Sequence, residues 1–254
     1  MKKTVRTGVK INLGLRVLGK RPDGFHDLET LFVPYDGFGD DLSVEPAEAF
    51  GISIEGCDWD PMSDLTARAW RLLHDEFNIP PVNMELVKGA PVGAGLGGGS
   101  ADAAAAIRIL GDLFALGLDD AALASRAAAL GSDCAFFIYG RPMFGTGRGE
   151  ILEPFDIDLS DYEIKVEVPR GVAVSTAEAY RGVLASRNPD TMPLREALAR
   201  PVPQWKELLV NDFEATVFPA HPEIAALKQD FYDRGAVYAS MSGSGSAVFG
   251  LWPR

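Results

Sequence analysis

The sequence predicts an α+β fold, and three observations carry that prediction. The chain has 254 residues, of which 47% are hydrophobic, enough to build one large core or two modest ones. Segments with strand and helix periodicity follow one another without the regular alternation of a doubly wound sheet. An acidic, irregular stretch around 154–161 separates the two halves. It divides the chain into an expected N-terminal domain, 1–155, and an expected C-terminal domain, 156–254.

Alternating apolar and polar residues predict the strands of the first half. The clearest case is 9–18, in which the apolar residues face one side while Lys10, Asn12 and Arg16 face the other. Turns rich in glycine and proline bound shorter strands at 28–34, 41–45, 51–56 and 84–87. A short apolar run predicts a further strand at 134–139.

Helices are expected where apolar residues recur at helical spacing or where alanine and leucine dominate. The first half has them at 64–77, 100–116 and 119–130, and Ser100 is the expected N-cap of the second. In the second half, helices are expected at 176–186, 194–199, 204–209 and 222–234. Strands are expected there at 163–168, 236–240 and 247–251.

Composition argues against several classes of partner. The formal net charge is −12, and an acidic surface disfavours both nucleic acid and an anionic membrane. Cys57 and Cys134 lie far apart and are expected as reduced thiols in a cytoplasmic protein. The charged N-terminus is not followed by the apolar segment of a signal peptide, and no apolar run is long enough to cross a bilayer.

The most informative segment is Pro91-Val-Gly-Ala-Gly-Leu-Gly-Gly-Gly-Ser100, which has five glycines in seven positions and precedes an alanine-rich helical run. Glycine permits positive φ and lets the backbone come close to a polyanion. A helix that begins here adds N–H groups and the positive end of its dipole. The segment is therefore predicted to hold phosphates.

The glycine segment is a poor match to two well-known nucleotide-binding motifs and to a flexible linker. Gly93-x-Gly95-x-x-Gly98 matches a dinucleotide fingerprint, but the acidic residues at the required distance, Asp119 and Asp120, open a helix instead of ending a strand. A Walker loop would need a lysine where Ser100 stands. The helix former that follows disfavours a flexible linker. A tight turn without a ligand stays open until other residues are considered.

Four motifs in order resemble those of the GHMP small-molecule kinases. They are Val9-Lys-Ile-Asn-Leu-Gly-Leu15, the glycine segment with the Ala-Asp-Ala-Ala-Ala run after it, Gly131-Ser-Asp-Cys134 and Ser240-Met-Ser-Gly-Ser-Gly245. Within this family, Arg21-Pro-Asp-Gly-Phe-His-Asp-Leu-Glu-Thr-Leu-Phe32 and the triple glycine are similar to the members that phosphorylate a diphosphocytidyl-linked methylerythritol. The resemblance runs over about 8–249.

The resemblance implies an N-terminal ribosomal-S5-like domain that carries the phosphate loop and a C-terminal ferredoxin-like domain. It implies ATP as the phosphoryl donor, arriving as its magnesium complex. The implied acceptor is the 2-hydroxyl of 4-diphosphocytidyl-2-C-methyl-D-erythritol, in non-mevalonate isoprenoid precursor biosynthesis. By motif position, Lys10 and Asp133 match the catalytic pair. Asn12, Phe25 and His26 match substrate-side positions, with His26 expected to meet the cytosine. The implied ATP loop consists of Pro91, Val92, Gly93, Ala94, Gly95, Leu96, Gly97, Gly98, Gly99, Ser100 and Ala101.

Three departures from the family pattern matter. Phe25 stands where tyrosine is usual, so a ring remains without its hydroxyl. Gly99 stands where related kinases place a magnesium-binding serine, and no matching glutamate is found, so a protein-held magnesium is not predicted. Asp102 lies in the first turn of the phosphate helix, where an inward carboxylate would repel ATP. It is therefore expected to point outward and stabilise the helix start.

Phosphoryl transfer suits these residue types, because it needs an aligned acceptor and stabilisation of charge on the moving group. Asp133 is expected to orient the hydroxyl and accept its proton late, while Lys10 offers positive charge to the γ-phosphate. Two alternatives stay open: another GHMP kinase that uses homoserine, mevalonate or a sugar, and a nucleotide-binding module without turnover. The sequence does not indicate an oligomeric state.

Overall fold

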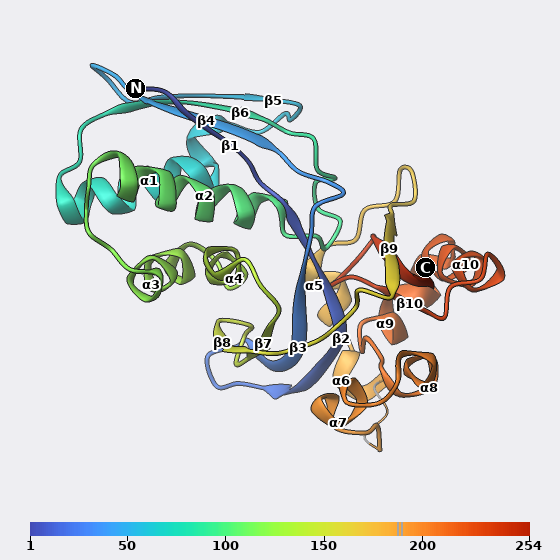
Figure 1. Cartoon of the computed structure of the whole chain (residues 1–254). Helices are drawn as coiled ribbons and strands as arrows, with labels where there is room; N and C mark the ends of the chain where they lie inside the picture. Colours follow the sequence, from blue (N-terminus) through green and yellow to red (C-terminus); the bar gives the residue numbers. More distant parts are fainter. Residues whose placement is uncertain (187, 189) are drawn as a thin grey trace. The chain divides into compact units, whose positions relative to one another are not determined.

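The computed structural model describes residues 1–186, 188 and 190–254, and its mixture of sheets and helices confirms the α+β prediction (Figure 1). The chain forms two compact units, each assembled from several stretches of sequence. The first unit comprises 1–10, 34–92 and 97–141, and the second comprises 11–33, 93–96 and 142–254. A division into contiguous domains after residue 155 stays a prediction.

A four-stranded sheet in the order β1-β4-β6-β5 forms the base of the first unit. Its strands are β1 (Lys3–Arg6), β4 (Asp41–Pro46), β5 (Gly51–Glu55) and β6 (Val82–Val87). β4 runs antiparallel to β1 and β6, whereas β5 runs parallel to β6. Burial alternates along β4 and β6, so one face of the sheet carries the apolar side chains.

Helices cover that sheet on one side (Figure 1). They are α1 (Leu65–Phe77), preceded by the short helix η1 (Pro61–Ser63), α2 (Gly98–Leu113), α3 (Asp120–Leu130) and α4 (Cys134–Tyr139). α2 contacts α1 and β4, and α3 and α4 pack on α2. Aspartates cap three of them: the side chain of Asp60 accepts from the Met62 amide at η1, that of Asp64 from the Thr66 amide at α1, and that of Asp119 from the Ala122 amide at α3.

The strand predicted at 134–139 is wrong, because the segment forms helix α4. A six-residue apolar run has no polar positions from which to read a period of two or of 3.6, so sequence could not separate the two structures. Gly140 ends the helix in the left-handed region, with a φ of 60°. As part of this helix, the apolar residues Cys134 and Phe136 are buried.

Two sheets belong to the second unit. The first has the order β2-β3-β7-β8 and is formed by β2 (Val9–Lys20), β3 (His26–Tyr35), β7 (Met143–Thr146) and β8 (Ile151–Pro154). β2 passes from the first unit into the second after Lys10. The other sheet is antiparallel, in the order β10-β11-β9, and is formed by β9 (Tyr162–Glu167), β10 (Tyr238–Met241) and β11 (Val248–Pro253).

A series of helices follows β9 in the chain and precedes β10 of the same antiparallel sheet. They are α5 (Thr176–Tyr180), α6 (Val183–Ser186), α7 (Leu194–Leu198), η2 (Val202–Gln204), α8 (Trp205–Leu208), α9 (Glu214–Ala220) and α10 (Pro222–Asp233). The single helix predicted at 176–186 is two, because Gly182 has a φ of 83° and interrupts it. α10 packs on β10 and β11, over a buried cluster that includes Leu15, Phe231 and Val248. Over the described ranges, no helix is both long and apolar enough to cross a membrane.

Candidate active site

The start of α2 has no side-chain cap. Gly97 caps the helix in the left-handed region, with a φ of 75°, and makes no side-chain hydrogen bond to it. Ser100 therefore lies inside the first turn and is not the N-cap that the sequence predicted. Because the first N–H groups of a helix have no acceptor within the helix, a glycine cap leaves them for a ligand.

Lys10 and Asp133 meet beside this helix start, within the first unit. Nζ of Lys10 lies 3.6 Å from Oδ2 of Asp133, which immediately precedes α4. A methyl group on Gly97 would lie 3.3 Å from Cε of Lys10, so the lysine side chain runs past the cap of α2. Lys10 is 3% exposed. Burial lowers the pKa of Lys10, and the charge of Asp133 opposes that effect.

A second ionic group lies behind the same helix start, and we call Thr7, Asp40, Lys88 and Asp102 the Lys88 cluster. Nζ of Lys88 binds the carboxylate of Asp40 and lies 2.6 Å from Oδ2 of Asp102. Oγ1 of Thr7 donates to Oδ1 of Asp102 at 2.9 Å. A methyl group on Gly98 would lie 3.4 Å from Oδ2 of Asp40, so the cluster directly adjoins the first residue of α2.

Asp102 points inward, which corrects the outward orientation expected from its place in the first turn. Its side chain is fully buried. Lys88 lies between Asp102 and Asp40 and balances the charge that would otherwise exclude a carboxylate. Burial raises the pKa of Asp102 to about 7 despite Lys88, and Asp40 adds to the rise. Burial also acts upward on the pKa of Asp40, but the amide of Ala90 and Lys88 outweigh it and leave that pKa below its usual value.

The two cysteines are free thiols, as the sequence predicted. Cys134 is buried at the start of α4, and burial raises the pKa of its thiol to about 11. Burial and the raised pKa both disfavour the thiolate, so Cys134 has the character of a packing residue. Over the described ranges, the side chains of His, Cys, Asp and Glu form no group of three or more that could hold a metal ion.

Of the predicted ATP loop, Gly93–Leu96 belong to the second unit. In the second unit these residues lie against the glycine-rich turn that follows β10. Oγ of Ser242 donates to the carbonyl of Gly95 at 3.1 Å, and the amide of Ala247 donates to the carbonyl of Ala94 at 3.0 Å. Gly95 has a φ of 76°, and a methyl group there would lie 2.1 Å from the carbonyl oxygen of Ser242. Only glycine fits this position.

Asn12 is buried on the polar side of β2, in the second unit. Nδ2 of Asn12 donates to Oγ1 of Thr30 at 2.9 Å, and Oγ of Ser242 lies 3.4 Å from Oδ1 of Asn12. These contacts fix the orientation of the amide. They also join β2 to the turn that touches Gly95.

Aromatic rings gather around the other predicted substrate residues. The ring of His26 stacks on that of Tyr180 with centroids 4.6 Å apart. Phe25 is 55% exposed, and the guanidinium of Arg148 lies 4.8 Å from its ring centroid. Tyr180 and Arg148, which contact these predicted substrate residues, were not among the residues that the sequence indicated. Both come from segments far along the chain, and nothing in the spacing around them signals a partner in the Phe25–His26 segment.

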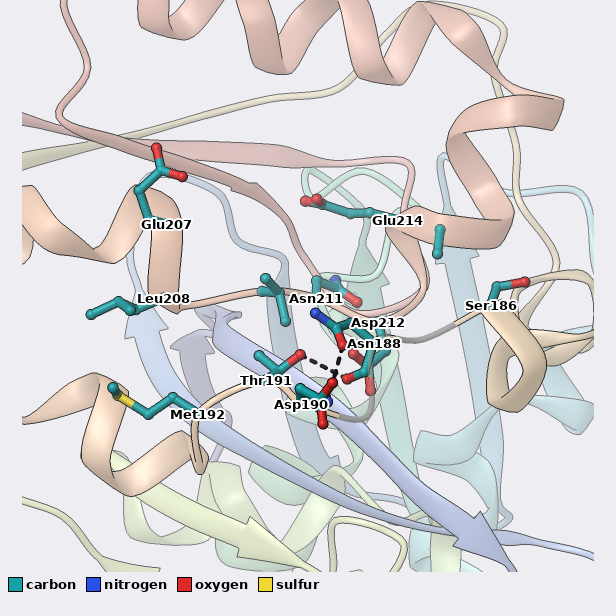
Figure 2. Close-up of a pocket in the computed structure, with 12 residues that line it drawn as sticks. Ser186, Asn188, Asp190, Thr191, Met192, Glu207, Leu208, Asn211, Asp212 and Glu214 are labelled. Atoms are coloured by element: carbon teal, nitrogen blue, oxygen red, sulfur yellow. Dashed lines mark hydrogen bonds between the residues drawn. The ribbon is translucent and has the colours of Figure 1, made fainter.

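The second unit also has a hollow of about 570 Å³, which is distinct from the predicted site (Figure 2). None of the predicted site residues lines it. Carboxylates from Asp190, Glu207, Asp212 and Glu214 contribute to its wall. This charge would repel a polyphosphate, so the hollow is not a candidate for the ATP site.

Comparison with known families agrees with the motifs. The family described as "GHMP kinases N terminal domain" matches residues 64–141, and "GHMP kinases C terminal" matches residues 194–254. A 4-diphosphocytidyl-2-C-methyl-D-erythritol kinase of Bacteroides thetaiotaomicron is 44% identical over 96% of this chain and 89% of its own length. One from Nitratidesulfovibrio vulgaris is 37% identical over 99% of this chain and 90% of its own.

Solved structures extend the comparison. The crystal structure of a 4-(cytidine 5'-diphospho)-2C-methyl-D-erythritol kinase superposes with a TM-score of 0.81 at 35% identity, covering 98% of this chain and 90% of that one. The mevalonate kinase of Methanococcus jannaschii superposes with a TM-score of 0.73 at 13% identity, covering 99% of this chain and 91% of that one. At such low identity the second likeness concerns the fold alone.

Proposed function

Because this chain belongs to the 4-diphosphocytidyl-2-C-methyl-D-erythritol kinase family of the GHMP kinases, we propose that it transfers the γ-phosphoryl group of ATP to the 2-hydroxyl of 4-diphosphocytidyl-2-C-methyl-D-erythritol. The product would serve non-mevalonate isoprenoid precursor biosynthesis. The observation that carries the proposal is the meeting of Lys10, Asp133 and the glycine-capped start of α2.

Each part of that arrangement has a role in phosphoryl transfer. The first amides of α2 and its dipole would bind the β- and γ-phosphates. Lys10 would place positive charge where negative charge develops on the moving group. Asp133 would accept a hydrogen bond from the acceptor hydroxyl, hold it in line, and take its proton late in the reaction.

The residues at this site do not fit a magnesium ion held by the protein. Gly99 has no side-chain oxygen, and the nearby carboxylates of Asp40 and Asp102 are bound by Lys88. Asp133 is already within ion-pair distance of Lys10. We propose that any magnesium enters with ATP and is bound by its phosphates, and no protein step depends on it.

Phe25, His26 and Tyr180 have the chemistry that recognition of a cytidyl group needs. Nucleobases stack on aromatic faces, and their edges need hydrogen-bonding partners. Phe25 and Tyr180 offer faces, and His26 offers both a face and a hydrogen-bonding edge. The absence of a hydroxyl on Phe25 leaves stacking intact.

The proposal is tested by offering ATP and one alcohol at a time to the purified protein and measuring ADP. The alcohols are 4-diphosphocytidyl-2-C-methyl-D-erythritol, homoserine and mevalonate. We expect turnover with the first only. Turnover with homoserine or mevalonate alone would refute the substrate and keep the kinase class, whereas nucleotide binding without any turnover would favour a binding module.

Lys10→Ala and Asp133→Asn supply the mechanistic test. Both variants should fold, and each should lose at least ~100-fold in kcat, because each removes one charge from the reacting centre. Far-ultraviolet circular dichroism checks the fold. Near-normal kcat in both folded variants would overturn the assigned roles.

A further inference from the structure

Asn211 is a buried polar residue that the reaction does not use directly. It lies between α8 and α9 and is 2% exposed. Its Nδ2 donates to the carbonyl oxygens of Met241 and Gly243, at 2.8 Å each, and its Oδ1 accepts from the amide of Phe213 at 3.0 Å. Both N–H groups and the oxygen of the Asn211 side-chain amide therefore have backbone partners.

Asn211 hydrogen-bonds to the turn after β10, and this turn contacts Gly95 of the predicted ATP loop. Met241 ends β10, and the turn runs from there through Gly245. Within that turn, Oγ of Ser242 donates to the carbonyl of Gly95, and the carbonyl oxygen of Ser242 would lie 2.1 Å from a methyl group on Gly95. A displacement of the turn would therefore displace the middle of the loop.

Asn211 is also tied to β2. The amide of Leu15 donates to the carbonyl of Val210 at 2.9 Å, and the amide of Asp212 donates to the carbonyl of Leu15 at 2.8 Å. Leu15 and Asn211 thus form a parallel bridge, and the side chain of Asp212 accepts from the amide of Val17 at 2.7 Å. One short segment holds both the strand that carries Asn12 and the turn that contacts Gly95, all within the second unit. Figure 2 labels Asn211 and Asp212 of this segment.

From these contacts we propose that Asn211 is a positioning residue for nucleotide binding: it holds the Met241–Gly245 turn so that Gly95 keeps the shape of the ATP loop. This inference rests on the proposed function, since it assumes that the loop binds ATP. It assigns Asn211 no contact with ATP or with the alcohol. Its effect should therefore fall on nucleotide affinity and not on recognition of the cytidyl group.

The chemistry explains why the residue is asparagine. Aspartate has nearly the same shape but no hydrogen to donate, so its carboxylate would face the carbonyl oxygens of Met241 and Gly243. Alanine would leave both carbonyls buried without this donor. Either change should loosen the turn, and aspartate should do so more because it adds repulsion.

The test compares Michaelis constants in Asn211→Asp and Asn211→Ala with those of the natural chain. We expect the KM for ATP to rise roughly 10-fold or more, as the loss of buried hydrogen bonds implies, while the KM for the alcohol changes less than about 3-fold. The dissociation constant of ADP, measured by calorimetry, should rise in parallel with the KM for ATP. Asn83→Asp is the matched control, because it adds the same charge on β6 in the first unit, and it should leave both constants unchanged.

Two outcomes would overturn the inference. One is an unchanged ADP affinity in a folded Asn211 variant, and the other is an equal rise in both Michaelis constants, which would indicate a general structural defect. If both Asn211 variants fail to fold, Ser242→Ala tests the same link by removing the donor to Gly95, and an unchanged ADP affinity there refutes it. A natural chain that binds no nucleotide would contradict the proposed function instead.

Discussion

Asp102 is the buried carboxylate whose titration should be visible in the stability of the protein. Its pKa is raised from 3.8 to about 7, first by burial and further by Asp40, against the opposing effect of Lys88. The perturbation is Asp102→Asn, which keeps the size of the side chain and an acceptor for Thr7 but carries no charge at any pH. Asp112→Asn on the exposed side of α2 is the matched control.

The sign follows from proton binding. Between about pH 4 and pH 7 the folded protein binds a proton at Asp102 that the unfolded chain has released, so the free energy of unfolding falls as the pH rises through that window. One pKa unit corresponds to about 1.4 kcal/mol, so the elevation corresponds to on the order of 4 kcal/mol. The pKa of Asp40 is lowered, so Asp40 changes the free energy of unfolding only below this window. A carboxylate of this kind loses its stabilising effect as the pH falls through its folded-state pKa.

The assay is urea unfolding of the natural chain and of both variants, at pH values of about 4.5, 6, 7 and 8. These values lie on both sides of the pKa of Asp102. Because the series begins at about pH 4.5, above the unfolded pKa, we expect Asp102→Asn to gain on the order of 3 kcal/mol relative to the natural chain between its ends, whereas Asp112→Asn should stay parallel to the natural chain. A relative change at Asp102 of less than about 1 kcal/mol would refute the raised pKa. It would then follow that Lys88 keeps both carboxylates of its cluster ionised.

Two further substitutions separate nucleotide binding from recognition of the cytidyl group. Gly99 lies in the first turn of α2, and a methyl group there would meet no protein atom within 4 Å. Gly99→Ala should therefore raise the free energy of unfolding by about 0.5 kcal/mol. Because the proposal places a phosphate of ATP beside this residue, the same variant should raise the KM for ATP. A stabilised variant with an unchanged KM would show that phosphate does not approach this residue. Tyr180→Leu removes the ring that stacks on His26 and should raise the KM for the cytidyl alcohol roughly 10-fold, with the KM for ATP unchanged. The reverse pattern would place the base elsewhere.

Local signals in the sequence were sufficient for most of the fold. The alternation over 9–18 predicted a strand that the structure extends to Val9–Lys20, and the helices around α1, α2 and α3 begin and end within three residues of their predicted bounds. The strands β1, β7 and β8 and the helix α9 were not predicted. They are short segments, and a few residues carry too little periodicity to separate strand, helix and turn.

The candidate site was found from motifs, not from geometry. The spacing of glycines indicated a phosphate loop, and the motif order then indicated a family that supplied Lys10 and Asp133. Tyr180, Asn211 and the Lys88 cluster were beyond reach of that reasoning. Each contacts residues that are distant in the sequence, and a single sequence carries no signal for such pairs.

By itself, the sequence determined the acidic composition, the order of most elements, the glycine-rich loop that enters a helix, and the family. These properties depend on residue type and near neighbours, which is where propensity and periodicity act. Only the tertiary structure decided that Asp102 turns inward, that Gly97 and not Ser100 caps α2, and that Lys10 reaches Asp133. The physical reason is that burial, charge pairing and backbone geometry are set by what packs against a residue, and for these residues the partners are distant in the chain.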